Sequence, residues 1–238
     1  MRSRVPAEVS KELRRYAEPG RAESSRRFFQ TGSGQYGEND RFLGIRVPHI
    51  RKVVKDFRGL PLHSTMELLR SPWHEERLFA LLMLVESFRE GEAETRSGIY
   101  RLYMENTRWV NSWDLVDLSA PHVPGAWLFR RDREPLYRFA AAADLWKRRI
   151  SIVATLHFIR ENDFRDTLGI SEVLLHDDHH LIHKAAGWML REVGKRAPDI
   201  EEDFLRKHCA IMPRTMLRYA IERFPEPKRR MYLRGEVR

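Results

Sequence analysis

The sequence KAAGWML, residues 184–190, begins with a basic residue that is followed three positions later by a glycine. The same order of a basic residue and then a small or aliphatic one recurs in other segments. The four pairs are Arg77 with Ala80, Arg149 with Ile152, Lys184 with Gly187, and Arg218 with Ile221. The basic positions lie about 72, 35 and 34 residues apart. A unit of roughly 35 residues is therefore repeated along the chain.

Helical periodicity fills almost every segment outside the loops, and the sequence lacks the alternating pattern of strands bounded by hairpin turns. We therefore predict an all-α protein. Helices are expected at about residues 6–18, 21–31, 48–58, 63–71, 74–89, 93–106, 113–119, 124–130, 134–143, 146–161, 164–174, 179–195, 199–209 and 213–224.

The repeat also predicts how the chain is divided. A period of roughly 35 residues favours one stacked array, which we expect over residues 1–225. From Pro225 the sequence PEPKRRMYLRGEVR is basic and loses clear periodicity. Residues 226–238 are therefore expected to form a basic C-terminal tail, either a solvated terminus or an arm that adds phosphate contacts.

The charge of the chain points to a polyanionic partner. Lys and Arg number 43 against 34 Asp and Glu, which gives a net charge of +9. Nucleic acid is the first candidate, although a ribosome or an anionic membrane surface would also fit. No segment reaches the eighteen or so apolar residues of a membrane span. The start lacks the apolar core of a secretory signal, and one cysteine excludes an internal disulfide framework. We expect a cytoplasmic monomer, nucleoid-associated if bacterial.

One repeat position is unusual. Halving the first gap predicts a further member near residue 113, where the chain reads WDLVD, residues 113–117. Asp114 takes the basic position there and Asp117 the small one. A carboxylate at an expected packing position favours a functional role. Trp113 and Asp117 are four residues apart and share one helix face, whereas Asp114 is expected to point outward as a cap or first-turn charge.

The basic positions themselves suggest a contact surface. If the repeated helices stack about 10 Å apart, the basic residues form a line roughly 40 Å long, close to one duplex turn of about 34 Å. Arg77, Arg149, Lys184 and Arg218 would then follow a phosphate backbone, helped by Arg148. The alternative is that they are exposed helix residues paired with nearby glutamates.

A histidine-rich segment, HDDHH at residues 176–180 followed by His183, resembles a metal site. His179 and His183 would share a helix face, but a third ligand with zinc spacing is not evident. We expect Asp177 or Asp178 to cap a helix and predict no metal and no cofactor.

Three segments carry a family resemblance: WDLVD at 113–117, WKRR at 146–149 and HKAAGW at 183–188, with a looser match in GIRVP at 44–48. Together they resemble the AlkD-like DNA alkylation repair glycosylases, which are built from HEAT-like helical repeats. The resemblance implies a right-handed superhelical solenoid. It also implies that Trp113 and Asp117 contact the deoxyribose of the lesion, that Trp188 is a further site tryptophan, and that Arg149, or Arg148 beside it, binds DNA. Ser112 stands where some relatives have another aromatic residue, which affects the range of lesions.

The resemblance implies a monofunctional glycosylase that removes cationic N3- or N7-alkylated purines from duplex DNA. Such a base departs neutral, so an oxocarbenium-like sugar remains to be stabilised. A carboxylate about 4 Å away, at an effective dielectric near 20, contributes roughly 4 kcal/mol. Asp117 would supply this charge, and Trp113 and Trp188 would contact the sugar while the base stays stacked. The alternative is a non-catalytic scaffold that binds DNA or RNA structures, with Asp117 in a structural hydrogen bond and both tryptophans in the core.

Overall fold

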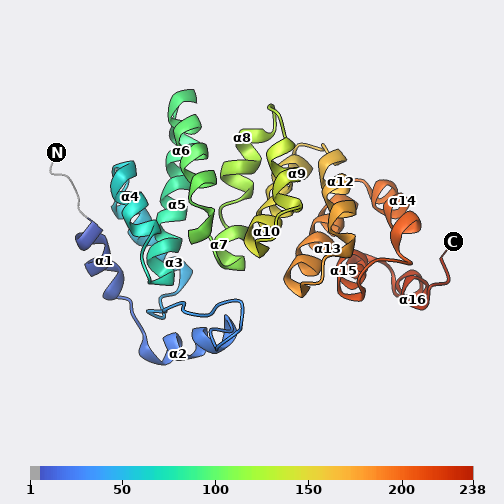
Figure 1. Ribbon diagram of the computed structural model, residues 1–238, viewed down its shortest axis with the longest axis horizontal. Coiled ribbons are helices and arrows are strands. Elements are labelled where there is room, and N and C mark those ends of the chain that lie inside the picture. The colour runs from blue at the N-terminus through green and yellow to red at the C-terminus, as the bar shows by residue number, and fades with distance from the viewer. Residues whose placement is uncertain (1–5, 238) are drawn as a thin grey trace. The chain divides into compact units, whose positions relative to one another are not determined.

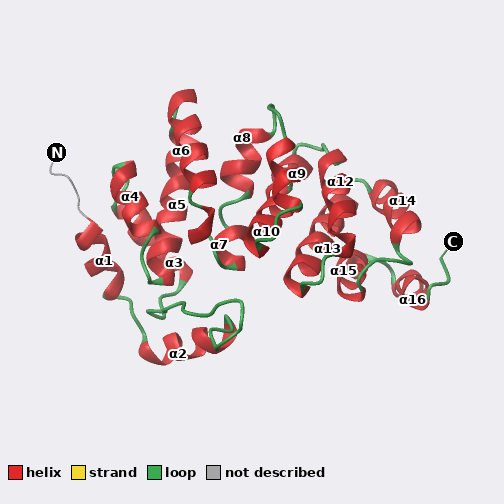
Figure 2. Cartoon of the chain, in the orientation of Figure 1, coloured by secondary structure: helices red, strands yellow, loops and turns green. Residues whose placement is uncertain are grey.

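The computed structural model describes residues 6–237 (Figure 1). Within this range every regular element is a helix and none is a strand (Figure 2). The all-α prediction is confirmed. Among the residues that the structure describes, no helix is both long and apolar enough to cross a membrane. The chain forms two compact units, and the boundary between them lies between Ser119 and Ala120.

Unit 1 is organised around a long buried helix, α5. The elements of the unit are α1 (Pro6–Arg14), α2 (Pro19–Phe28), α3 (Val47–Asp56), α4 (Leu62–Leu69), α5 (His74–Glu90), α6 (Ala93–Glu105), the short η1 (Thr107–Trp109) and α7 (Trp113–Asp117). Helix α5 packs against α3, α4, α6 and α7. Its interior residues are apolar and buried, but its first turn buries four charged or polar side chains, those of residues 74–77.

A long loop, residues 29–46, connects α2 to α3 (Figure 2). A side chain from the first turn of α5 holds this loop. The carboxylate of Glu75 accepts hydrogen bonds from the amides of Leu43 at 2.9 Å, Gly44 at 2.7 Å and Ile45 at 3.2 Å. Gly44 has a φ of +79°, and a Cβ there would lie 2.3 Å from the carbonyl oxygen of Glu18. Only glycine fits this position. The loop is thereby fixed next to the start of α5.

Unit 2 is organised around α13. The elements of the unit are the π-helical turn η2 (Pro121–Gly125), α8 (Ala126–Leu128), α9 (Glu134–Ala140), α10 (Leu145–Ala154), α11 (Leu156–Arg160), α12 (Arg165–Val173), η3 (Leu174–His176), α13 (His180–Gly194), α14 (Pro198–His208), α15 (Arg214–Ala220), η4 (Ile221–Arg223) and α16 (Glu226–Arg234). Helix α13 packs against α10, α12, α14 and α15. The small positions of the sequence repeat, Ala80, Ile152, Gly187 and Ile221, are all buried, as a packing role requires.

The sequence expectation for residues after Pro225 is wrong in one respect. They do not lose helical structure, because α16 covers Glu226–Arg234. Glu226 pairs with Arg229 at 3.3 Å and with Arg230 at 2.9 Å. Tyr232 is only 2% exposed, and Lys228 reaches Glu202 of α14 at 2.5 Å. Burial and these ion pairs give the segment partners that its composition alone does not reveal.

Candidate active site on α7

Helix α7 begins at Trp113 and ends at Asp117, so the two residues lie one turn apart, as the sequence predicts. Both side chains are half-buried, whereas Leu115 and Val116 between them are buried. Burial of Leu115 and Val116 attaches α7 to the core. Trp113 and Asp117 are left at the margin between core and solvent.

Trp113 belongs to an aromatic cluster formed with Phe28, Phe29 and Phe42. The ring of Phe29 stacks on Trp113 with centroids 5.2 Å apart and an interplanar angle of 16°. Phe28 meets Trp113 edge-on at 5.7 Å and is 65% exposed. Phe29 also stacks on Phe42, with ring centroids 5.0 Å apart. The indole orientation is therefore set by rings from the end of α2 and from the long loop.

Asp117 places a negative charge near a buried phenol. Burial raises the pKa of Tyr103 well above its usual range, and the charge of Asp117 raises it further. The Tyr103 hydroxyl oxygen is 2.9 Å from Oγ of Ser119, and the Ser119 hydroxyl donates to the Leu115 carbonyl at 2.6 Å. Asp117 is itself half-buried, and a partly desolvated carboxylate interacts with a nearby cation more strongly than one in bulk water.

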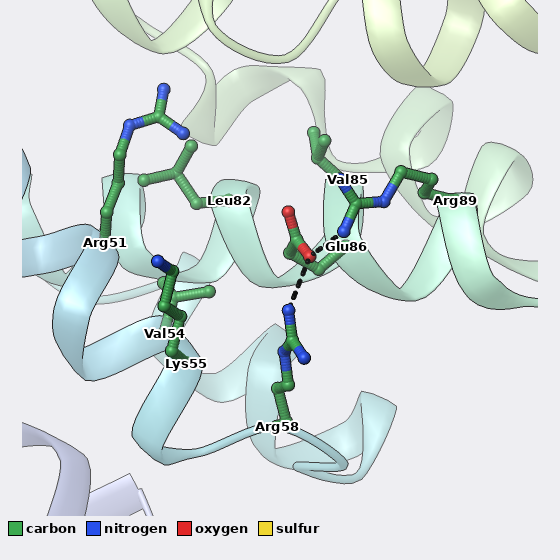
Figure 3. Close-up of a pocket in the computed structure, with 8 residues that line it drawn as sticks. All are labelled: Arg51, Val54, Lys55, Arg58, Leu82, Val85, Glu86 and Arg89. Carbon is green, nitrogen blue, oxygen red and sulfur yellow. Dashed lines mark hydrogen bonds and ion pairs between the residues drawn. The ribbon is translucent and has the colours of Figure 1, made fainter.

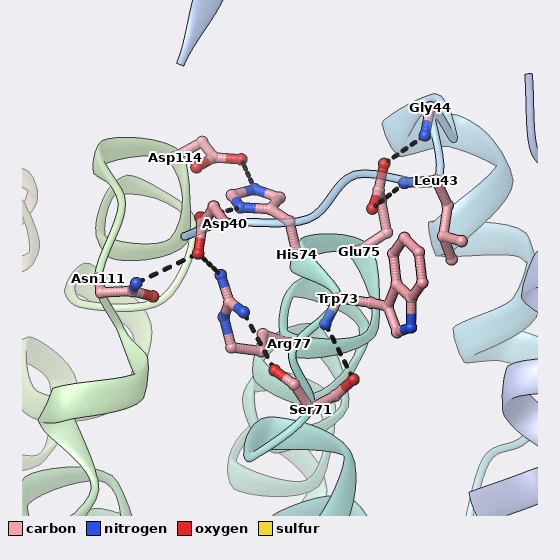
Figure 4. A network of polar contacts seen from close by, with 10 residues as sticks. All are labelled: Asp40, Leu43, Gly44, Ser71, Trp73, His74, Glu75, Arg77, Asn111 and Asp114. Atoms are coloured by element: carbon pink, nitrogen blue, oxygen red, sulfur yellow. Dashed lines mark hydrogen bonds and ion pairs between the residues drawn. The ribbon is translucent and has the colours of Figure 1, made fainter. Parts of the chain in front are cut away.

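Asp114 does not point outward as the sequence suggests. Its Oδ2 atom is 2.8 Å from Nε2 of His74, and His74 Nδ1 is 3.1 Å from Oδ2 of Asp40 (Figure 4). The side chains of His74 and Asp40 are 3% and 6% exposed. Since each imidazole nitrogen faces a carboxylate oxygen, both nitrogens donate and the ring carries a positive charge. The outward expectation fails because a partner from α5 draws this carboxylate inward.

The pKa shifts agree with this charge assignment. Burial alone would lower the pKa of His74, but the charge of Asp114 and the hydrogen bonds to Asp114 and Asp40 outweigh it and raise the pKa to about 9. Burial would raise the pKa of Asp114, and the charge and hydrogen bond of His74 overcome it, so the pKa lies below its usual value. The pKa of Asp40 is lowered against burial by His74 and Arg77.

Arg77 is part of the same network and not of an exposed basic line. It is 3% exposed, its Nη2 donates to Asp40 Oδ1 at 2.6 Å, and its Nη1 donates to the Ser71 carbonyl at 3.0 Å. Asn111 also donates to Asp40 at 3.3 Å. The expectation that Arg77 contacts a phosphate backbone is wrong, because its charge is buried and neutralised by Asp40.

The site residues predicted in unit 2 differ in exposure. Arg149 is 5% exposed and donates to the Leu181 carbonyl at 2.6 Å, so the expectation of an exposed side chain is wrong for it as well. Arg148 is half-buried and pairs with Asp177 at 2.6 Å. On α13, Lys184 and Trp188 are half-buried and one turn apart, and Trp188 Nε1 donates to Glu192 at 3.1 Å. Arg218 is exposed.

The histidine-rich segment forms a helix start. His179 is the N-cap of α13, and its ring accepts from the Leu181 amide at 3.1 Å. Asp177 accepts from the His179 amide at 2.8 Å. The capping residue is therefore His179 and not either aspartate. In the part of the chain that the structure describes, no group of three ligand side chains could hold a metal ion.

A cavity of about 300 Å³ lies between α3 and α5 and was not foreseen from the sequence (Figure 3). Four basic side chains surround a single carboxylate, that of Glu86. They are Arg51, Lys55, Arg58 and Arg89. Glu86 pairs with Arg89 at 2.6 Å and with Arg58 at 3.7 Å. The excess of cations makes this cavity attractive to anions, so part of the positive charge of unit 1 is concentrated here.

The fold and sequence are similar to those of known proteins. Residues 9–224 match the model of a family described as DNA alkylation repair enzyme. No curated protein matches the chain. A solved structure described as a predicted DNA alkylation repair enzyme from Enterococcus faecalis is similar, with a TM-score of 0.68 and 15% sequence identity over 88% of this chain and 97% of that one. This likeness confirms the predicted helical repeat fold.

Proposed function

Because the chain belongs to the DNA alkylation repair enzyme family, we propose that it is a monofunctional DNA glycosylase acting on cationic N3- or N7-alkylated purines in duplex DNA. The observation that carries the proposal is the pairing on α7 of a half-buried carboxylate, Asp117, with a half-buried indole, Trp113, one turn away. The stacked Phe29 ring holds that indole in place.

The reaction requires little from the protein. The bond between C1′ and the purine nitrogen breaks, and its electron pair neutralises the cationic base, which leaves without a proton from the enzyme. Positive charge then develops on the sugar, and the Asp117 carboxylate stabilises it. At about 4 Å and an effective dielectric near 20, this interaction contributes roughly 4 kcal/mol, or about a thousandfold in rate. A water molecule then bonds to C1′ through its oxygen and gives up a proton, which Asp117 can accept.

Trp113 supports the same step. An aromatic face attracts a cation and excludes bulk water, which strengthens the interaction between the carboxylate and the sugar. The flanking Phe28 is exposed and extends the apolar surface beside the indole. The base can therefore remain stacked while the sugar is recognised, as the resemblance to AlkD-like glycosylases suggests.

The proposed partner is duplex DNA containing alkylated bases, bound by a monomer without a cofactor. The net charge of +9 supports binding to the phosphate backbone. In unit 2, Arg218, Lys184 and Arg148 keep at least part of their side chains accessible. Within unit 2, Trp188 is half-buried and we propose it as a further contributor to DNA binding, whereas Arg149 is buried and donates to the Leu181 carbonyl at the start of α13.

The test is the substitution Asp117→Asn. We expect release of 7-methylguanine from methylated duplex DNA to slow by about a thousandfold, because the stabilising charge is lost. DNA affinity should change less than about threefold, since no phosphate contact is removed. The matched control is Asp203→Asn, an exposed aspartate on α14, which should release base at the wild-type rate.

Two outcomes would contradict the proposal. Wild-type release by folded Asp117→Asn would remove Asp117 from the chemistry. Wild-type protein that binds methylated DNA but frees no base would support the non-catalytic scaffold instead.

A further inference from the structure

His74 lies between the long loop and α7 and contacts both through its two ring nitrogens. We propose that His74 is a positioning residue: by holding Asp114, it fixes the first turn of α7 and so orients Trp113 and Asp117 toward the substrate. This inference rests on the proposed function, because it concerns the same site.

Helix α7 is too short to be stable as an isolated helix. It is only five residues long, and helices this short are not stable by themselves because most of their backbone groups lack partners within the helix. Its orientation must therefore come from tertiary contacts. Asp114 is the second residue of α7, and its contact with His74 at 2.8 Å joins the first turn to α5.

The helix that carries His74 is itself packed on several sides. His74 is the first residue of α5, which packs against α3, α4, α6 and α7. Glu75, the next residue, binds three backbone amides of the long loop. The imidazole therefore lies at the start of α5, next to the residue that anchors the long loop (Figure 4).

The third step is charge balance. The charged groups that face His74 are Asp40 from the loop and Asp114 from α7, and Arg77 of α5 binds Asp40 on its other side. Two cations thus offset two carboxylates inside unit 1. Removing the charge on His74 leaves Asp114 buried with one fewer counter-charge, and such a group moves toward solvent or takes up a proton. Either change shifts the start of α7.

The fourth step is that His74 also acts on Trp113 through the aromatic cluster. Its ring stacks on Phe42 at 4.5 Å and lies 5.0 Å from Phe29. Phe29 in turn stacks on Trp113 at 5.2 Å. The imidazole of His74 therefore supports α7 through its ring nitrogen, which contacts Asp114, and supports the indole of Trp113 through the stacked phenylalanine rings.

The main experiment measures single-turnover release of 7-methylguanine at saturating protein. We expect His74→Gln to slow release by about 10- to 100-fold, since a displacement near 1 Å at a reacting centre has effects of this size. DNA affinity should change less than about threefold. The matched control is His208→Gln: His208 is also a buried histidine beside a carboxylate, Glu172 at 2.9 Å, but it lies on α14. We expect wild-type release from this variant.

A pH profile separates positioning from a general loss of stability. With His74 at a pKa of about 9, wild-type single-turnover release should fall about threefold between pH 8 and pH 9.5. The double variant His74→Gln with Asp114→Asn replaces the ion pair by an amide hydrogen bond without net charge. It should release base faster than His74→Gln alone and should lack the decline above pH 8.

The outcomes are distinct. A folded His74→Gln protein with wild-type release, or a double variant that releases base no faster than His74→Gln alone, would overturn the positioning role. If His74→Gln does not fold, the double variant and the wild-type profile decide the question. Wild-type release by Asp117→Asn would overturn the proposed function itself, whereas an inactive Asp117→Asn beside a fully active His74→Gln would overturn only this inference.

Discussion

Gly187 shows how one residue of the repeat determines packing. It lies on α13 where α15 crosses, and a Cβ placed on it would lie 2.4 Å from the carbonyl oxygen of Met216 and 2.6 Å from Cβ of Tyr219. Neither atom is the end of a flexible side chain. The two helices approach this closely only because position 187 has no side chain.

We therefore expect Gly187→Ala to destabilise unit 2 by about 1–3 kcal/mol, because α13 and α15 must move apart. The control is Gly98→Ala in α6, where an added Cβ meets nothing within 4 Å. Alanine is a better helix former than glycine, so this change should stabilise by about 0.5–1 kcal/mol. Denaturant unfolding of both variants measures the difference. Equal stability of the two would contradict the close packing at Gly187.

The sequence points to single residues of the candidate site but not to their distant partners. The repeat spacing draws attention to Asp117 and the neighbouring Trp113, whose role in the site stays a prediction. It cannot place Asp114, because the partner of that residue, His74, is 40 positions away in the chain. Helical position alone makes Asp114 a first-turn charge, and the tertiary contact then turns it inward. The detectable signal was the run HEER, residues 74–77, at the start of an otherwise apolar helix.

At the scale of elements, most helices could be predicted from periodicity and prolines, since the apolar stripe and the missing amide donors are local properties. Two features were not. The helix expected at 146–161 is divided at Thr155 into α10 and α11, where a Cβ on Gly125 would lie 2.3 Å from the Ala154 carbonyl oxygen. Helix α16 was missed although Pro227 near its start and Gly235 after its end, with a φ of +72°, are ordinary helix boundary signals.

Helix α16 buries Tyr232, which is 2% exposed and packs against Phe224 with ring centroids 5.6 Å apart. We expect Tyr232→Ala to destabilise unit 2 by about 3 kcal/mol, because a large buried ring is removed. The adjacent Met231 is 45% exposed, and Met231→Ala should change stability by less than about 0.5 kcal/mol. Thermal unfolding followed by circular dichroism distinguishes the two. A Tyr232→Ala protein as stable as wild type would mean that α16 contributes nothing to the unit.

For the whole molecule, a net charge of +9 correctly directs attention to a polyanion, but it does not say which cations are available. Arg77 and Arg149 are buried, whereas Arg218 is exposed and Arg51 and Lys55 line an open cavity. Burial of an arginine depends on where its acceptors lie in the fold, and these are far away in sequence. The distribution of charge therefore had to come from the structure.

In each unit a buried group with a raised pKa makes stability fall as pH rises. In unit 2 the carboxyl group of Glu201 is 3% exposed. Burial raises the pKa of this group from 4.5 to about 8, although Lys228 and Arg191 lower it. In unit 1 the pKa of His74 is raised from 6.5 to about 9 by its carboxylate partners against the effect of burial. In both cases the folded state retains a proton that the unfolded state has lost, so stability falls as pH rises.

The pH ranges over which Glu201 and His74 affect stability differ, and together they predict how the stability of the whole chain changes with pH. Stability linked to Glu201 is full below pH 4.5 and is lost up to about pH 8, and that linked to His74 is full below pH 6.5 and is lost up to about pH 9. Each group lowers stability by at most about 1.4 kcal/mol per pH unit within its window. Melting temperatures measured from pH 5 to pH 9 should therefore decline most steeply between pH 6.5 and pH 8, where the windows overlap.

Two variants show which group causes which part of the fall in stability as pH rises. Glu201→Gln should match wild type near pH 5 and be more stable at pH 8, by up to about 3 kcal/mol, because the amide has no proton to lose. His74→Gln should instead remove the part of the decline between pH 6.5 and about 9, and it should be less stable than wild type at pH 6 because the ion pair is lost. A melting temperature that stays constant from pH 5 to pH 9 would contradict both assignments. A decline that persists unchanged in one variant would contradict only the group altered there.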